Sequence, residues 1–446
     1  MLRVSKINPR YFADETGKAI YLSGSHSWIN CKDYRYDNGT LLPFDYAEYL
    51  KFLKRHNFNF IRLWTWDLAR SPQRLDYYAD VIWHRSPFPW PRTGPGEAND
   101  GLPKFDLTRF DQAYFDRIRA RVIAAGKHGV YVSVMLFNGI DHLTCRIRGT
   151  GFPFDLGNNV NGIVCGGTRS QTLLSPAVTA IQEAYVRKVI DTVNDLDNVL
   201  YEIANEAGDH SIEWQYHMVT CIKAYQATKP NQHPVGITSI TDADNGTLFA
   251  SPADWVSPNR HDGFGYPSEP PSADGRKVVI NDTDHSFFFI GLKAAGQDGQ
   301  REWVWKNFTR GYNTAFMDPY LMPWPNRNVV DGTKLDPYWE VIRANLTYTR
   351  NLADRLNLDA MQPRPELAST RYCLANPAAE RAAYVVYLPD RTPATVDLCA
   401  TSGKLGVEWF DPYRGTTTDG GMVDGGTVRS FAPKVEKDAV LYLSQR

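Results

Sequence analysis

Residues 197–208 read Asp-Asn-Val-Leu-Tyr-Glu-Ile-Ala-Asn-Glu-Ala-Gly, a short apolar run that ends in an Asn-Glu pair, a small residue and a glycine. This pattern predicts a buried parallel strand that carries the carboxylate of Glu206 to its C-terminal end. A buried acid is costly unless it is ion-paired or takes part in chemistry. The alternative is a strand-end acid that only caps the helix that follows.

Segments of the same kind recur along the chain and alternate with segments of helical periodicity. Strands are expected near 21–25, 59–66, 130–138, 198–205, 235–239, 255–258, 277–281 and 313–317. Helices are expected over 45–57, 110–128, 175–194, 211–228, 301–309 and 337–356. Eight strands alternating with helices, with polar residues at the strand ends, predict an α/β fold of the (β/α)₈ barrel type. A doubly wound sheet is the alternative, but no G-x-G-x-x-G turn follows the first strand.

The residue composition and pattern change in two segments outside the predicted barrel strands. Residues 69–106 are rich in proline and aromatic residues, which predicts an irregular functional loop over the site. After about 360, short β-like runs punctuated by glycine pairs predict an antiparallel β-sandwich. We therefore expect a barrel domain over 1–360, with an N-terminal hairpin around Gly17 that plugs its floor, and a β-sandwich over 361–446.

Composition restricts the class of partner. The chain has 446 residues, with 49 basic against 50 acidic side chains, so neither nucleic acid nor an anionic membrane is expected as a partner. Aromatic residues reach 13%, and many lie beside polar residues, which suits carbohydrate. The six cysteines are widely spaced and predict mostly free thiols, and the N-terminus predicts a cytoplasmic protein unless a signal peptide has been removed. The oligomeric state stays open.

Two acids at opposite sides of a barrel mouth could cleave a glycosidic bond. That reaction needs one carboxylic acid to protonate the leaving oxygen and a second carboxylate to attack the anomeric carbon or to activate water. Glu206 ends the fourth strand, and Asp282 and Asp284 follow the seventh, which lies across the mouth from it. The alternative for residues 282–285 is a loop held by Asx-turn and capping bonds. An Asp-x-Asp-His cluster could also hold a metal, but the sequence offers no matching distant ligands.

The chain resembles the clan A glycoside hydrolases, with a cellulase-like, family 5-like barrel. The resemblance rests on Asn205-Glu206 at the fourth strand, on Arg62 at the second, and on the barrel-plus-sandwich layout. Closer similarity, to bacterial cellulase-like proteins whose C-terminal domain is labelled collagen-binding, lies in Asn8-Pro9-Arg10-Tyr11-Phe12-Ala13-Asp14, Gly24-Ser25-His26-Ser27-Trp28, Asn281-Asp282-Thr283-Asp284-His285 and Trp409-Phe410-Asp411-Pro412. That label names a sequence family and is not taken as a sign of collagen binding.

The resemblance implies roles for individual residues. Glu206 takes the position of the general acid/base, Asn205 that of a contact to the sugar 2-hydroxyl, and Arg62 that of a support for the nucleophile. The clan nucleophile is ordinarily Glu, whereas this chain has Asp282 and, two residues on, Asp284. Asp282 is preferred narrowly because it directly follows the strand. The shorter side chain leaves three options open: an Asp nucleophile that reaches farther in, an inverting enzyme, or a barrel that has lost hydrolysis.

Further strand-end residues are candidates for substrate binding, each with packing or ion pairing as the alternative. The set is His26, Trp28, Arg62, Trp64, Trp66, Asn138, Asn205, His261, His285 and Asp318. Asp318 could instead pair with an arginine. Glu202 lies on the same strand face as Glu206 but deeper, so we expect it to be a buried partner for a base such as Arg62.

The sequence thus predicts a glycosidase that hydrolyses O-glycosyl bonds of a poly- or oligosaccharide, retaining, with Glu206 as acid/base and Asp282 or Asp284 as the second carboxylate. It predicts no metal and no cofactor. The alternative is a carbohydrate-binding barrel without turnover.

Overall fold

The structure is a computed structural model. It describes residues 1–446 except 37, 43, 71–82, 140–141, 143–148, 242, 259–274, 287–288, 321–336, 379–380 and 446. Predictions for His261 and Cys145 lie outside the described residues.

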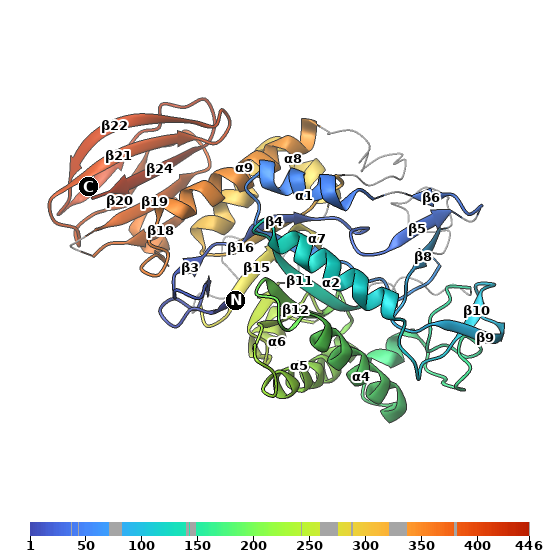
Figure 1. The fold of residues 1–446 in the computed structure, drawn as a ribbon. Coiled ribbons are helices and arrows are strands. Elements are labelled where there is room, and N and C mark those ends of the chain that lie inside the picture. The colour runs from blue at the N-terminus through green and yellow to red at the C-terminus, as the bar shows by residue number, and fades with distance from the viewer. Residues whose placement is uncertain are drawn as a thin grey trace.

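Eight parallel strands close into a barrel at the centre of the molecule (Figure 1). In chain order they are β4 (Ser23–His26), β7 (Phe60–Leu63), β11 (Tyr131–Asn138), β12 (Val199–Asn205), β13 (Val235–Thr238), β14 (Trp255–Ser257), β15 (Val278–Asp282) and β16 (Asn313–Met317). Strand β16 pairs with β4, and β4 pairs with β7, which completes the ring. The predicted (β/α)₈ fold is confirmed, with β12 as the fourth barrel strand and β15 as the seventh.

Helices surround the barrel, and several begin at a capping aspartate. They are α1 (Tyr46–Arg55), α2 (Gln112–Gly126), α4 (Pro176–Val193), α5 (Ile212–Gln226), α6 (Asn245–Ala250), α7 (Thr283–Ser286), α8 (Phe289–Thr309) and α9 (Pro337–Arg355). Single 3-10 turns lie at η1 (Gly167–Gln171), η2 (Asp209–Ser211) and η3 (Pro365–Leu367). The side chains of Asp45, Asp111 and Asp244 accept from backbone N–H groups in the first turns of α1, α2 and α6.

The N-terminal segment closes the floor of the barrel, as predicted. Strands β1 (Arg3–Val4), β2 (Phe12–Ala13) and β3 (Ala19–Ile20) form a small antiparallel sheet. Leu2 and Phe12 are fully buried in one apolar cluster with Phe60, Leu200 and Val278 from the barrel strands. This packing fills the end of the barrel opposite the strand C-termini.

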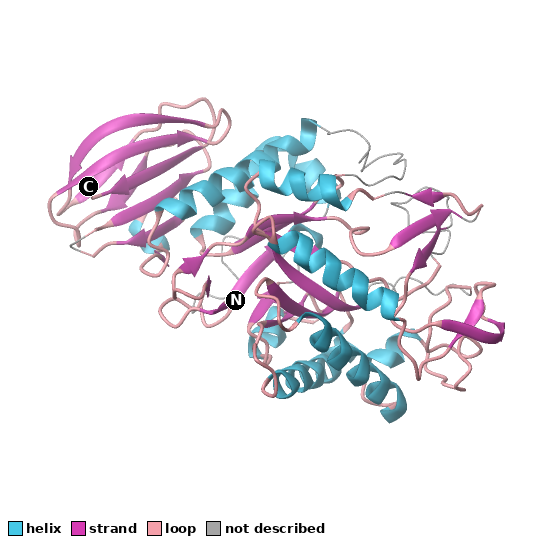
Figure 2. Ribbon diagram, in the orientation of Figure 1, coloured by secondary structure: helices cyan, strands magenta, loops and turns pink. Residues whose placement is uncertain are grey.

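Within residues 69–106, the part that the structure describes is more regular than predicted. Strand β8 (Trp83–Ser86) joins β5 (Asp33–Tyr36) and β6 (Leu41–Leu42) in a three-stranded sheet. Strands β9 (Arg92–Glu97) and β10 (Pro103–Phe105) form a separate antiparallel pair. Figure 2 shows both sheets at one side of the barrel. The prediction of an irregular loop was wrong here because tertiary pairing with β5 supplies hydrogen-bond partners that the local sequence does not reveal.

The C-terminal segment folds into antiparallel sheets. Six strands run in the order β17 (Gln362–Pro363), β18 (Cys373–Asn376), β19 (Ala383–Leu388), β24 (Ala439–Ser444), β21 (Lys404–Asp411), β22 (Thr416–Asp424). Strands β20 (Ala394–Asp397) and β23 (Val428–Phe431) make a second sheet. The large sheet packs against α8 and α9, with Trp305 and Leu352 in one apolar cluster with Val385. A buried ion pair, Arg301 Nε to Asp438 Oδ1 at 2.8 Å, adds a polar link between α8 and this domain.

Two further observations bear on the sequence predictions. Cys31, Cys165, Cys221, Cys373 and Cys399 are free thiols. Among the described residues, no helix combines the length and the apolar character that crossing a bilayer requires.

Candidate active site

Glu206 lies directly after β12 in a backbone conformation that is unusual for its residue type. Its φ is 48°, in the left-handed region that residues other than glycine rarely adopt. The following turn is held in place by Thr241, whose N–H donates to the carbonyl of Ala207 at 2.9 Å and whose hydroxyl donates to the carbonyl of Glu206 at 3.3 Å. Such a conformation persists only where the surrounding contacts hold it. These contacts therefore fix the direction in which the Glu206 side chain points.

Gly139, at the end of the neighbouring strand β11, allows this turn to approach. Its N–H donates to the carbonyl of Asn205 at 2.6 Å. A Cβ on Gly139 would lie 2.2 Å from the Cα of Ala207, closer than atoms can come. The position therefore requires glycine because the backbone that carries Glu206 occupies the space.

Gly139→Ala is expected to lower kcat/KM on glycosides by about 10- to 100-fold, because moving a reacting group by about 1 Å has an effect of this size. The overpacking should also lower the free energy of unfolding by about 1–3 kcal/mol. Gly166→Ala is the matched control, since a Cβ there meets nothing within 4 Å. Urea unfolding and steady-state kinetics of both variants check this, and equal behaviour of the two would contradict it.

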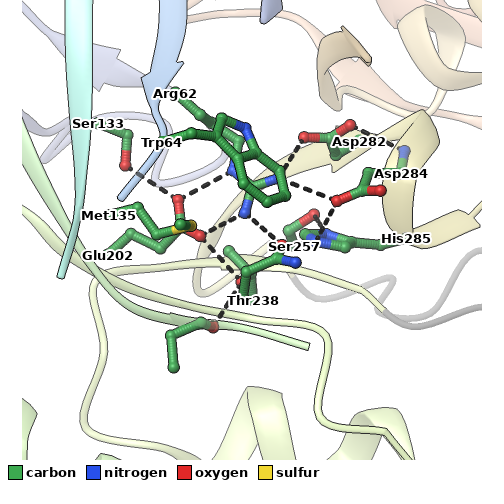
Figure 3. A network of polar contacts seen from close by, with 12 residues as sticks. Arg62, Trp64, Ser133, Met135, Glu202, Thr238, Ser257, Asp282, Asp284 and His285 are labelled. Carbon is green, nitrogen blue, oxygen red and sulfur yellow. Dashed lines mark hydrogen bonds and ion pairs between the residues drawn. The ribbon is translucent and has the colours of Figure 1, made fainter. Parts of the chain in front are cut away.

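Arg62, on β7, is buried at the centre of a network of carboxylates (Figure 3). Its Nε donates to Glu202 Oε2 at 3.0 Å and its Nη2 to Glu202 Oε1 and to Asn205 Oδ1, the last at 2.6 Å. Its Nη1 donates to Asp282 Oδ2 at 3.1 Å and to Asp284 Oδ2 at 3.4 Å. Burial alone would lower the pKa of Arg62, but Glu202 and Asp282 raise it, so the guanidinium stays charged.

Glu202 is the buried partner of Arg62, as the sequence predicted. It is fully buried, and the hydroxyls of Ser133 and Thr238 also donate to its carboxylate, at 3.3 Å and 3.2 Å. The sequence analysis missed these two hydroxyls. Each is a single polar residue within an apolar barrel strand. Because a buried hydroxyl requires a hydrogen-bond partner, this pattern in the sequence could have indicated both residues.

Asp282 ends β15 and is held on both oxygens. His26 Nε2 lies 3.0 Å from Oδ1 and 2.8 Å from Oδ2, Arg62 contacts Oδ2, and the N–H of Asp284 donates to Oδ1 at 2.9 Å. The last bond is the capping role considered as an alternative for residues 282–285. Burial would raise the pKa of Asp282, but His26 and Arg62 together lower it below its ordinary value.

Asp284 and His285 lie in the short helix α7 and bring a second carboxylate to Glu206. One side-chain ligand atom from each of Glu206, Asp284 and His285 lies within 4.8 Å of the other two. Burial raises the pKa of Asp284 well above its ordinary value, the charges of Glu206 and Asp282 raise it further, and Arg62 opposes them. Like charges at this distance disfavour ionisation of both groups at once.

His285 is oriented by two neighbours. Its Nε2 lies 2.9 Å from Asn205 Oδ1 and its Nδ1 2.7 Å from the hydroxyl of Ser257, another residue that the sequence analysis missed. Because Arg62 also donates to Asn205 Oδ1, that atom is an acceptor, so His285 Nε2 carries a proton. Burial, followed by the charge of Arg62, holds the pKa of His285 well below its ordinary value.

Glu206, Asp284 and His285 offer donor types that a metal ion can use. A metal ligand must offer a lone pair, and His285 Nε2 has none while it donates to Asn205. Two carboxylates would remain, one of them shared with Arg62. The arrangement therefore suits a pair of neighbouring carboxyl groups better than a divalent cation.

Three tryptophans and one aspartate among the predicted substrate contacts are buried in contacts within the protein. Trp28, Trp64 and Trp66 are at most 6% exposed and pack on one another, with Trp66 Nε1 donating to the carbonyl of Trp28 at 2.7 Å. Asp318 is fully buried and pairs with Arg343, Nε to Oδ2 at 2.9 Å, which is the arginine pairing considered as its alternative. The contacts of Trp28, Trp66 and Asp318 are those of the packing and ion-pairing alternatives, and substrate contact by these three residues stays a prediction.

Two buried amides lie at the strand ends as predicted. Asn138 and Asn205 are register partners at the ends of β11 and β12. Among the described residues, the Nδ2 of Asn205 and both polar atoms of the Asn138 side chain have no hydrogen-bond partner. Unused buried donors and acceptors at a barrel mouth are suited to hydroxyl groups of a ligand.

Comparison with solved structures gives the same architecture over nearly the whole chain. A glycoside hydrolase aligns with a TM-score of 0.63 and 16% identity, covering 99% of this chain and 96% of that chain. A family 5 glycoside hydrolase from Bacteroides vulgatus ATCC 8482 aligns with a TM-score of 0.65 and 15% identity, covering 99% and 92%. The chain shares its fold with glycoside hydrolases. At these identities the likeness establishes the fold, which is compatible with many activities.

The C-terminal domain matches a family model. Residues 366–444 match the family described as "Putative collagen-binding domain of a collagenase", which confirms the resemblance seen around Trp409-Phe410-Asp411-Pro412. Among curated protein sequences, none matches this chain significantly.

Proposed function

We propose that this chain is a retaining glycoside hydrolase in which Glu206 is the general acid/base and Asp284 the nucleophile. The observation that carries the proposal is the approach of the two carboxylates to within 4.8 Å at the barrel mouth. Retaining glycosidases hold their carboxyl groups about 5–5.5 Å apart, and inverting enzymes about 6.5–9.5 Å apart. The glycoside hydrolase fold supports the same reaction class.

The proposed reaction has two steps. In the first, a carboxylate oxygen of Asp284 attacks the anomeric carbon, the glycosidic C–O bond breaks, and Glu206 gives its proton to the leaving oxygen. In the second, Glu206 takes a proton from water, the water oxygen attacks the anomeric carbon, and the bond to Asp284 breaks. The first step requires the shared proton on Glu206 and an ionised Asp284. Burial raises the pKa of Asp284, so without substrate the proton favours Asp284, and Arg62, 3.4 Å from its Oδ2, supports the ionised form that attack needs.

The sequence narrowly favoured Asp282 as the nucleophile, whereas we propose Asp284 for this role. Asp282 is 1% exposed, and its two oxygens are engaged by His26, Arg62 and the N–H of Asp284. A nucleophile must reach the anomeric carbon, so a carboxylate held on both oxygens is better suited to support. We assign Asp282 to that supporting role and Asn205 Nδ2 to the sugar 2-hydroxyl that the resemblance implies.

Hydrolysis of an aryl glycoside by the wild-type chain is expected to release the sugar with its anomeric configuration retained, as followed by proton NMR. Glu206→Gln should lower kcat/KM, which reports the first step, by about 10²–10⁴-fold for a leaving group that needs protonation. The loss should be much smaller for an activated leaving group such as dinitrophenol. Inverted product would refute the nucleophilic role of Asp284. Glycan binding without turnover on any glycoside would instead favour the non-catalytic barrel.

A further inference from the structure

The indole N–H of Trp64 meets one ring nitrogen of His26. Trp64 Nε1 lies 2.8 Å from His26 Nδ1, and the two rings stack with centroids 5.7 Å apart. An indole N–H can only donate a hydrogen bond. His26 Nδ1 must therefore accept it, and it carries no proton while this contact exists.

The other nitrogen of His26 then faces Asp282 as a neutral donor. Nε2 carries the one ring proton and donates to the carboxylate, with both side chains at most 1% exposed. A cationic imidazole would place its Nδ1–H against the indole N–H at 2.8 Å, which is repulsive. The contact between His26 and Asp282 is thus a hydrogen bond to a charged acceptor and not an ion pair.

This neutrality affects the charge around the Glu206–Asp284 pair. Among the described residues, the titratable and charged groups joined to the pair through this network are His26 on β4, Arg62 on β7, Glu202 on β12, Asp282 on β15 and His285 on α7. Arg62 shares its charge among Glu202, Asp282 and Asp284. With His26 and His285 neutral, the negative charge of Asp282 favours retention of a proton nearby.

We propose that Trp64 is a positioning residue: by donating to His26 Nδ1 it keeps His26 neutral, and the charge left on Asp282 holds one proton on the Glu206–Asp284 pair. The proposal rests on the proposed glycosidase function for its effect on turnover. Its chemical basis, the tautomer of His26, does not depend on turnover and can be measured separately.

The first measurement is nitrogen NMR of the histidine side chains in the full chain, with the His26 signal assigned by its loss in His26→Gln. In the wild type, His26 Nδ1 is expected to stay unprotonated from pH 5 to 8. In Trp64→Phe, which keeps a ring beside His26 but removes the donor, His26 should become protonated within that range. Trp66→Phe is the matched control, because its indole donates to a backbone carbonyl. The control should match the wild type.

The second measurement is the pH dependence of kcat/KM for the same proteins. A cationic His26 lowers the proton affinity of the Glu206–Asp284 pair. The alkaline limb of the kcat/KM profile of Trp64→Phe should therefore move to lower pH by about one unit. The limb of Trp66→Phe should stay in place. A wild-type His26 that is cationic at pH 7, a His26 that stays neutral in Trp64→Phe, or an unshifted limb would each overturn the proposal. Absence of turnover in the wild type would refute the glycosidase function instead, and the NMR result would still decide the tautomer.

Discussion

Asp284→Asn is expected to lower kcat/KM on an aryl glycoside by at least about 10⁴-fold, a loss typical for removal of a catalytic nucleophile. The amide keeps the shape of the side chain but cannot attack the anomeric carbon. Asp282→Asn should lose only about 10- to 100-fold, because Asp282 does not attack the anomeric carbon. Its single amide oxygen can accept from Arg62 or from the N–H of Asp284 but not from both, and this accounts for the remaining loss. The comparison of the two isosteric variants is the measurement, since they lie two residues apart in one network.

Chemical rescue separates a lost nucleophile from a disturbed site. Asp284→Ala with added azide should regain turnover and form a glycosyl azide of inverted anomeric configuration, because azide takes the place of the carboxylate. Asp282→Ala should show no such rescue. Rescue of the Asp282 variant alone, with an active Asp284→Asn enzyme, would return the nucleophilic role to Asp282.

Arg62→Met is expected to lower the free energy of unfolding by about 3–5 kcal/mol at pH 7, the usual effect of removing one partner of a buried ion pair. Glu202 and Asp282 would remain buried without the guanidinium that both contact. Without Arg62, burial should raise the pKa of Asp282 in the folded variant above its unfolded value. The folded state then binds more protons than the unfolded state, so the variant loses stability as pH rises.

The sign of this pH dependence is opposite to that expected from Asp282 in the wild type. There the pKa of Asp282 is lowered, so its contribution is present above its unfolded pKa and is lost as pH falls. Denaturant unfolding of both proteins at pH 5 and pH 8 measures the difference, with a larger loss for Arg62→Met at pH 8. Arg119→Met, which removes an exposed pair with Asp195, is the control and should change stability by less than about 1 kcal/mol. An equal penalty for Arg62→Met at both pH values would contradict the charge argument.

Much of the barrel could be predicted because its signals are local. A strand buried on both faces, such as β12, needs a continuous apolar run, and its flanking helices need apolar residues every three to four positions. The pairing of Glu202 with Arg62 also followed, since a deep acid in an apolar strand requires a base. The small sheets made by β5, β6, β8, β9 and β10 could not be predicted, because their pairing joins short segments whose own sequence is irregular.

In the candidate site too, some features follow from the local sequence and others from tertiary contacts. The sequence by itself determined the chemical groups at the barrel mouth and the strands that deliver them: Glu206 after β12, and Asp282 with Asp284 after β15. Only the tertiary structure decided which aspartate turns toward Glu206, since that depends on where β15 ends and α7 begins. It also decided that the indole N–H of Trp64 meets His26 Nδ1, because a contact between residues at the ends of two strands is set by the closed barrel and not by the spacing of residues along the chain.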